Sequence, residues 1–164
     1  MLFRDENVQE LLNGLIKIGE VSSIDPAMGT ARVLFDDDDS LVSYDLQVLQ
    51  RNTFKNHDYA MPDVGEDVLC LFLPTGTEEG FILGSLYAGE VMPKESSGDV
   101  RSVVFADGSR LSFNRSTSEF DITIGATTIK VTGQNVNIVA PTVIDLKAPT
   151  ITLTMGGTTM VLSG

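Results

Sequence analysis

Residues 136–162 read VNIVAPTVIDLKAPTITLTMGGTTMVL, and the tripeptide Ala-Pro-Thr occurs in them at 140–142 and again at 148–150. The runs on either side of the prolines are rich in Val, Ile, Leu and Thr, which is typical of short β-strands. Proline removes a backbone donor from a sheet ladder, so we expect the chain to turn at each Ala-Pro. From residue 135 onward the pattern repeats about every eight residues.

Short segments of alternating apolar residues extend this pattern back to about residue 101, and glycine or proline separates many of them. Alternation with a period of two predicts strands that turn one face toward a core. The positions expected to face inward are Ile129, Val131, Val136, Ile138, Ile144, Leu146, Ile151, Leu153, Met160 and Leu162. The expected corners are Gly125, Gly133, Pro141, Pro149, Gly156 and Gly157.

Strands this short carry too few inward side chains to hold a sheet together in one chain. A single chain would also leave two unpaired edges and a bare apolar face, which favour aggregation. Three copies wound around one axis would share a core and pair every strand. We therefore expect an obligate homotrimer in which residues 101–164 form an intertwined, triple-stranded β-helix (a β-prism). The alternative is an ordinary meander sheet packed on the preceding domain.

The first two thirds of the chain predict a different structure. Residues 1–15 contain a short amphipathic helix, with Val8, Leu11, Leu12 and Leu15 on one face. Residues 16–90 contain five strand candidates separated by turn sequences, consistent with a small OB-fold barrel. Residues 91–100 are a polar linker rich in Pro, Ser and Gly. The predicted fold class is therefore all-β, with a barrel followed by a needle.

Charge disfavours nucleic acid as a partner. The formal net charge is −12, and residues 101–164 carry five basic and four acidic groups. Residues 1–100 therefore carry a net charge of −13, which repels phosphate backbones. An OB-fold protein that binds single strands remains an alternative, but such proteins combine a basic groove with stacking aromatics. The N-terminus has no signal-peptide pattern and no apolar run is long enough for a membrane span, so we expect a soluble protein made in the cytoplasm.

Several stretches together resemble a known family. These are LIKIGEVSSIDPAMGTARVLFDDDD at 15–39, PDVGEDVLCLFLPTGTEEGFILGSLYAGE at 62–90, VVFADGSRLSFN at 103–114 and the eight-residue repeats that follow. In this order they resemble the phage baseplate assembly protein V family, which is related to the valine-glycine-repeat spikes of type VI secretion. The VGExVL element at 64–69 and GFILGSLY at 80–87 carry most of the match.

The resemblance implies a central spike of a contractile tail, located in the virion baseplate and assembled in the host cytoplasm. It implies contacts with tail tube or hub and baseplate proteins, and transient contact with the host envelope that the spike pierces on sheath contraction. Larger relatives carry a lysozyme domain between barrel and needle, for which this chain has no room. Many members end in a His-x-His pair that binds iron at the tip, whereas this chain ends in TLTMGGTTMVLSG. We therefore expect a blunt needle or a separate tip-capping protein.

Few residues are candidates for chemistry. Cys70 is the single cysteine and lies in the apolar run VLCLFL, which predicts a buried, inert thiol. Asp36, Asp37, Asp38 and Asp39 lack the spacing of a calcium loop, and we expect a solvated turn. The only histidine, His57, has no serine on a nucleophile turn to accompany it. A paired-carboxylate glycosidase remains a weaker alternative. We therefore expect no enzyme activity, no cofactor and no metal.

Overall fold

The computed structural model describes residues 14–36, 40–73 and 79–163. The chain divides into two compact units, Met1–Met92 and Pro93–Gly164. The division lies within the stretch 91–100 that the sequence indicates as a linker. Of the helix predicted for residues 1–15, only Gly14 and Leu15 are among the described residues. Within the described residues no helix is long and apolar enough to cross a membrane.

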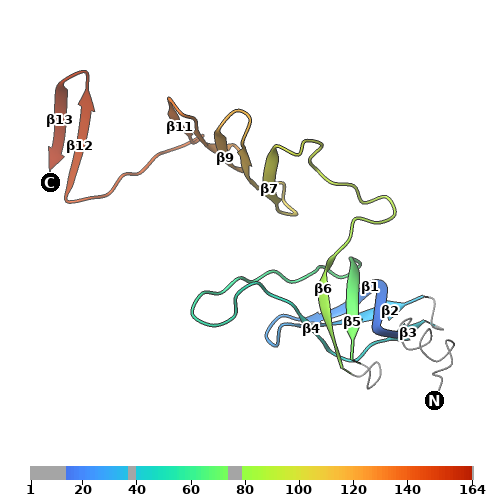
Figure 1. Ribbon diagram of the computed structural model, residues 1–164. Coiled ribbons are helices and arrows are strands. Elements are labelled where there is room, and N and C mark those ends of the chain that lie inside the picture. The colour runs from blue at the N-terminus through green and yellow to red at the C-terminus, as the bar shows by residue number, and fades with distance from the viewer. Residues whose placement is uncertain (1–13, 37–39, 74–78, 164) are drawn as a thin grey trace, which may run out of the picture. The chain divides into compact units, whose positions relative to one another are not determined.

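Strands of the first unit form a five-stranded barrel with a short sixth strand attached (Figure 1). Their bounds are β1 Ile16–Asp25, β2 Thr30–Phe35, β3 Leu41–Val42, β4 Leu46–Val48, β5 Asp67–Phe72 and β6 Gly80–Ser85. The hydrogen-bonded order is β1-β5-β6-β4-β2, and the pairing of β2 with β1 closes the ring. All pairs are antiparallel except β4 with β6. This closed five-stranded arrangement agrees with the predicted OB-like barrel.

The barrel interior is the buried core of the described residues. It consists of nine residues with at most 2% of their surface exposed: Val21, Ala31, Val33, Phe35, Leu46, Val68, Cys70, Phe72 and Ile82. The rings of Phe35 and Phe72 meet edge to face with their centroids 5.7 Å apart. Alternate residues of β5 are buried, because successive side chains of a strand point to opposite faces. Each of the five barrel strands contributes at least one of the nine core residues.

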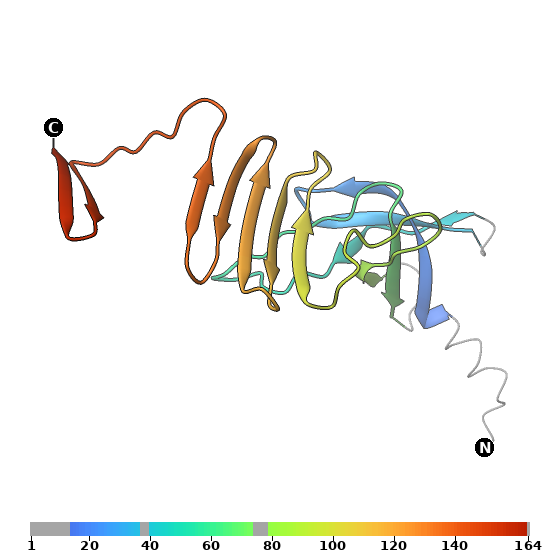
Figure 2. The ribbon, with the colours of Figure 1, turned by 90° about the horizontal axis from the view of Figure 1, so that it is seen from above.

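The second unit contains a five-stranded antiparallel meander and a separate hairpin (Figure 2). The meander strands are β7 Val100–Val104, β8 Arg110–Asn114, β9 Glu119–Ile124, β10 Thr127–Val131 and β11 Val136–Val139. The hairpin strands are β12 Thr150–Met155 and β13 Thr158–Ser163. The strands are paired in sequence order, β7-β8-β9-β10-β11. An all-β fold class is therefore confirmed.

Glycines make two of the tight turns in this unit. Gly125 has φ +55°, and Ile124 pairs with Thr127, so Gly125 begins a two-residue hairpin loop. Gly156 and Gly157 have φ +50° and +89° in the loop that joins β12 to β13. Two positive φ values in a two-residue loop define a turn whose twist suits a hairpin, and glycine adopts them without steric cost.

The segment between the meander and the hairpin differs from the expectation. The sequence pattern predicts a short strand around Ile144 and Leu146, yet residues 140–149 contain none. Pro141 and Pro149 mark the two ends of this segment, as expected of residues without a backbone donor. This segment pairs with none of the strands that the structure describes. The intertwined prism remains a prediction, because the described structure is that of a single chain.

Candidate association surface

Strand register gives the meander two chemically different faces. Directly paired residues of antiparallel strands project to the same side of a sheet. One row across the five strands is Val103, Leu111, Ile122, Ile129 and Ile138. The next row on that face is Arg101, Phe113, Phe120, Val131 and Val136. We call these two rows the apolar face.

The apolar face lies largely open in the single chain. Val136 is 67% exposed, Val103 is 56% exposed and Ile138 is 46% exposed. None of the ten residues of the two rows is buried. An antiparallel sheet with one apolar face normally packs that face on a core. This face therefore has the character of an association surface.

The opposite face is polar. Its central row, read through the same pairings, is Ser102, Ser112, Asp121, Lys130 and Asn137. Lys130 Nζ lies 2.6 Å from Glu119 Oε1. This ion pair lowers the pKa of Glu119 and raises that of Lys130. Partial burial, with the neighbouring Glu119 carboxylate, raises the pKa of Asp121. The polar face thus pairs Lys130 with Glu119, whereas the apolar face stays largely open in the single chain.

Two ion pairs attach the start of the second unit to the meander. Arg110 Nη2 lies 2.6 Å from Glu95 Oε1, and Arg115 Nε lies 2.5 Å from Asp99 Oδ1. Residues 95–99 therefore belong structurally to the second unit rather than to a free linker. Arg110 Nε is buried without a hydrogen-bond partner among the described residues. These contacts join residues 95–99 to β8 and to Arg115, which follows β8.

The structure places the ten predicted core positions in three groups. Ile129, Val131, Val136 and Ile138 are cross-strand partners on the apolar face. Ile151 pairs with Leu162, and Leu153 with Met160, in the hairpin. Ile144 and Leu146 lie exposed in the segment without strands.

The core predicted from the sequence begins at Ile129, whereas the apolar rows extend to β7. The alternation of Leu111 with Phe113, and of Phe120 with Ile122, was the signal for this longer face.

A braced arm leaves the barrel between β4 and β5. We define the arm as residues 50–60. Gln50 Nε2 donates to the Ala60 carbonyl at 2.8 Å, and the Ala60 N–H donates to Gln50 Oε1 at 3.0 Å. Further out, Asp58 accepts from Arg51 at 3.3 Å and from Asn52 at 2.7 Å. Thr53 and His57 form an isolated bridge next to the tip. These contacts join the two branches of the arm along its length.

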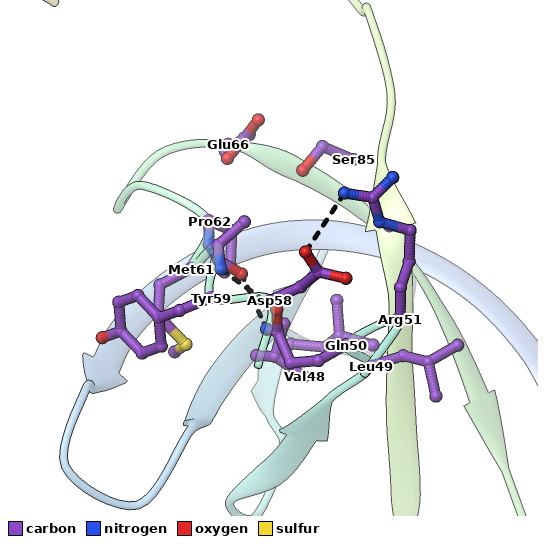
Figure 3. A pocket seen from close by; sticks show the side chains of 13 residues that line it. Val48, Leu49, Gln50, Arg51, Asp58, Tyr59, Met61, Pro62, Glu66 and Ser85 are labelled. Atoms are coloured by element: carbon purple, nitrogen blue, oxygen red, sulfur yellow. Dashed lines mark hydrogen bonds and ion pairs between the residues drawn. The ribbon is translucent and has the colours of Figure 1, made fainter. Parts of the chain in front are cut away.

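A pocket of about 430 Å³ lies at the base of the arm (Figure 3). Its apolar lining includes Leu49, Met61 and Ile82, and its charged lining is Arg51, Asp58 and Glu66. Figure 3 shows the Arg51–Asp58 pair on one side of the opening. The Asp58 carboxylate already accepts hydrogen bonds from Arg51 and Asn52. Glu66 Oε2 accepts a hydrogen bond from the Asp63 N–H at 2.9 Å. The pocket was not anticipated from the sequence, because its lining comes from segments up to 37 residues apart.

The remaining candidates for chemistry stay isolated. His57 is exposed on the arm, and Asp36 is the only member of the four-aspartate run that the structure describes. Across the described residues no cluster of three or more His, Cys, Asp or Glu side chains could hold a metal ion. Cys70 is buried in the barrel core, and burial raises its pKa to about 11. A thiol of this kind is a packing residue rather than a nucleophile.

Comparison with known proteins adds one relative. The chain is 27% identical over 147 residues to the protein named spike protein of Escherichia phage P2. The chain resembles a phage spike protein. The match covers 88% of this chain and 68% of that protein, so it includes most of both units. No protein-family model matches the chain. The similarity agrees with the resemblance to phage spikes seen in the sequence, without pointing to one member.

Proposed function

We propose that this protein is the trimeric central spike of a contractile tail. Three copies pack their apolar faces around one axis, and the barrels form the collar that contacts tail tube or hub and baseplate proteins. The spike is located in the virion baseplate, or in a tail-like particle, and is driven through the host envelope on sheath contraction. Its role is mechanical rather than enzymatic.

The open apolar face is the observation that carries this proposal. The two rows cross five strands and are apolar at nine of their ten positions, and six of these nine side chains are exposed in the single chain. At about 25 cal/mol for each Å² of apolar surface removed from water, covering such a face contributes strongly to stability. The apolar faces of several copies can cover one another, so no other protein is required to bury them. Closed symmetric assemblies are the usual form of soluble homo-oligomers.

Similarity supports the biological setting. The relative from Escherichia phage P2 is named a spike protein, and the matched region extends over most of this chain. A spike must resist unfolding under load. A trimer in which three chains share one core resists local opening, because several chains must separate together.

A matched pair of variants tests the trimer. Ile138 lies on the apolar face, and its neighbour Asn137 lies on the polar face of the same strand. Both side chains are exposed in the single chain. Ile138→Asp would bring three carboxylates toward one axis without partners, whereas Asn137→Asp would leave its carboxylate in water. We expect light scattering to give a trimer for the native chain and for Asn137→Asp, and loss of the trimer for Ile138→Asp.

Negative-stain images of the native protein should show a trimeric head with a thin projection. A native chain that scatters light as a folded monomer would refute the proposal. Measurable turnover of peptidoglycan by the purified trimer would instead contradict the purely mechanical role.

A further inference from the structure

The tip of the arm presents an aromatic ring, Phe54, and a cation, Lys55, and both side chains are exposed to solvent. Phe54 is 81% exposed, which is the largest exposed fraction among the large apolar side chains that the structure describes. Lys55 follows it and forms no ion pair with any described residue. The bonds at Gln50, Arg51 and Asn52 brace the arm behind the tip. Binding through a rigid segment loses little conformational entropy, so the exposed Phe54–Lys55 pair is suited to bind a partner surface.

The pocket at the base of the arm has the complementary chemistry. Leu49, Met61 and Ile82 offer an apolar lining for a ring, and Glu66 supplies a carboxylate at the same site. Glu66 accepts one hydrogen bond, from the Asp63 N–H, so it retains capacity for a cation. The pocket's volume of about 430 Å³ is large enough for an aromatic side chain. None of residues 53–57 lines the pocket of its own chain.

We propose that the Phe54–Lys55 tip of one copy inserts into the base pocket of the next copy around the trimer axis. Phe54 fills the apolar part of the pocket, and Lys55 pairs with Glu66 of the neighbouring copy. This inference rests on the proposed trimer and assigns it a second contact, between the barrels.

Charge and symmetry favour a second copy as the occupant. Residues 1–100 carry a net charge of −13, so barrels brought together repel one another. A lysine presented at the tip to a carboxylate of the neighbour offsets part of that repulsion. Tip and pocket are different patches of one unit, and a contact between unlike patches is head-to-tail. A head-to-tail contact closes into a ring when its rotation matches the trimer axis, and each tip and each pocket is then used once.

Cross-linking with a carbodiimide tests the contact, because the reagent joins a lysine amine to a carboxylate only when the two touch. Unlabelled and ¹⁵N-labelled full-length chains are unfolded, mixed and refolded together, so that links between chains give mixed-isotope peptides. We expect mixed-isotope peptides that join Lys55 to Glu66, and a covalent ladder that ends at three chains. Lys55→Arg keeps the charge and removes the reactive amine, so it should keep the trimer and lose this link.

Phe54→Ser provides the second arm of the test. The side chain is exposed, so the substitution leaves the barrel intact, and the apolar faces still hold the trimer together. The Lys55–Glu66 link should be lost from this variant while light scattering still gives a trimer. A native trimer in which Lys55 stays unlinked, links only within one chain, or links to other carboxylates of its neighbour overturns this contact alone. A native monomer overturns the proposed trimer, and this contact with it.

Discussion

Cys70 illustrates a residue whose chemistry is decided by burial. Its side chain lies in the barrel core, and loss of hydration disfavours the thiolate, which raises the pKa to about 11 from its ordinary 9.0. The apolar run VLCLFL predicts this burial directly, and the buried location is confirmed. The thiol therefore reports on the integrity of the barrel.

Alkylation of Cys70 should be slow in the folded protein. A pKa raised by about two units lowers the thiolate fraction near pH 8 by about 100-fold, and burial slows the reaction further. We expect Cys70 to react rapidly with iodoacetamide only in denaturant. Mass spectrometry measures the alkylated fraction over time. The raised pKa also means that this group's contribution to stability is complete below pH 9 and is lost as pH rises toward 11. Equal alkylation rates in native and denaturing buffer would contradict the buried state.

Asp121 should weaken the second unit at neutral pH. Its pKa is raised by desolvation and then by the Glu119 carboxylate, so folding favours the protonated form. A carboxyl group whose pKa is raised by folding stabilises the folded state at pH values below the unfolded pKa of 3.8. This contribution is lost as the pH rises through the folded pKa. We expect Asp121→Asn to raise the melting temperature at pH 7, and the gain to disappear as the pH is lowered to about 3.5. A gain that is equal at both pH values would have another cause.

At the scale of elements, close approach of strands explains two glycines of the barrel. A Cβ at Gly19 in β1 would lie 2.7 Å from a ring carbon of Phe35, and one at Gly80 in β6 would lie 2.8 Å from Phe72. The two aromatic rings of the core thus occupy the space that side chains would take. Pattern reasoning identified these strands and their turns, but not the reason for the glycines, because the clash joins residues from different strands.

Gly19→Ala should destabilise the barrel, and Gly84→Ala in β6 provides the matched control. A Cβ at Gly84 meets no atom within 4 Å. Forcing a methyl group against Phe35 and the neighbouring backbone requires the core to shift, which costs about 1–3 kcal/mol of unfolding free energy. Urea denaturation followed by circular dichroism measures both variants. Similar midpoints for the two would show that β1 and β2 separate without cost.

For the whole molecule, the critical question is what covers the second unit. The buried apolar core of the described residues lies entirely in the barrel, and none of the predicted inward residues from Ile129 to Leu153 is buried in one chain. A period of eight with proline at the corners predicts that further copies of the chain cover these residues, and this stays a prediction. A meander over residues 100–139 is the arrangement that a single chain adopts.

Ile144→Asp tests assembly in the segment without strands. Ile144 is 50% exposed in one chain, so the substitution leaves the chain's own fold intact. In the proposed trimer it would gather three carboxylates on one axis without partners, and we expect assembly to fail. Val143→Asp is the control, because adjacent residues of an extended chain face opposite ways. The measurement is resistance of the trimer band to hot detergent on a gel. A resistant Ile144→Asp trimer would remove Ile144 from the core.

The sequence by itself determined most of the strands and turns, because these depend on local periods and on the backbone limits of Gly and Pro. Examples are the alternation in β5 and the glycines of the β12–β13 loop. Only the tertiary structure decided which residues share a face, since Val103, Ile122 and Ile138 meet through register. It also decided the arm and its pocket, because Gln50, Ala60, Glu66 and Ile82 come together only when β4 lies beside β6. Contacts between residues distant in sequence leave no local period to read.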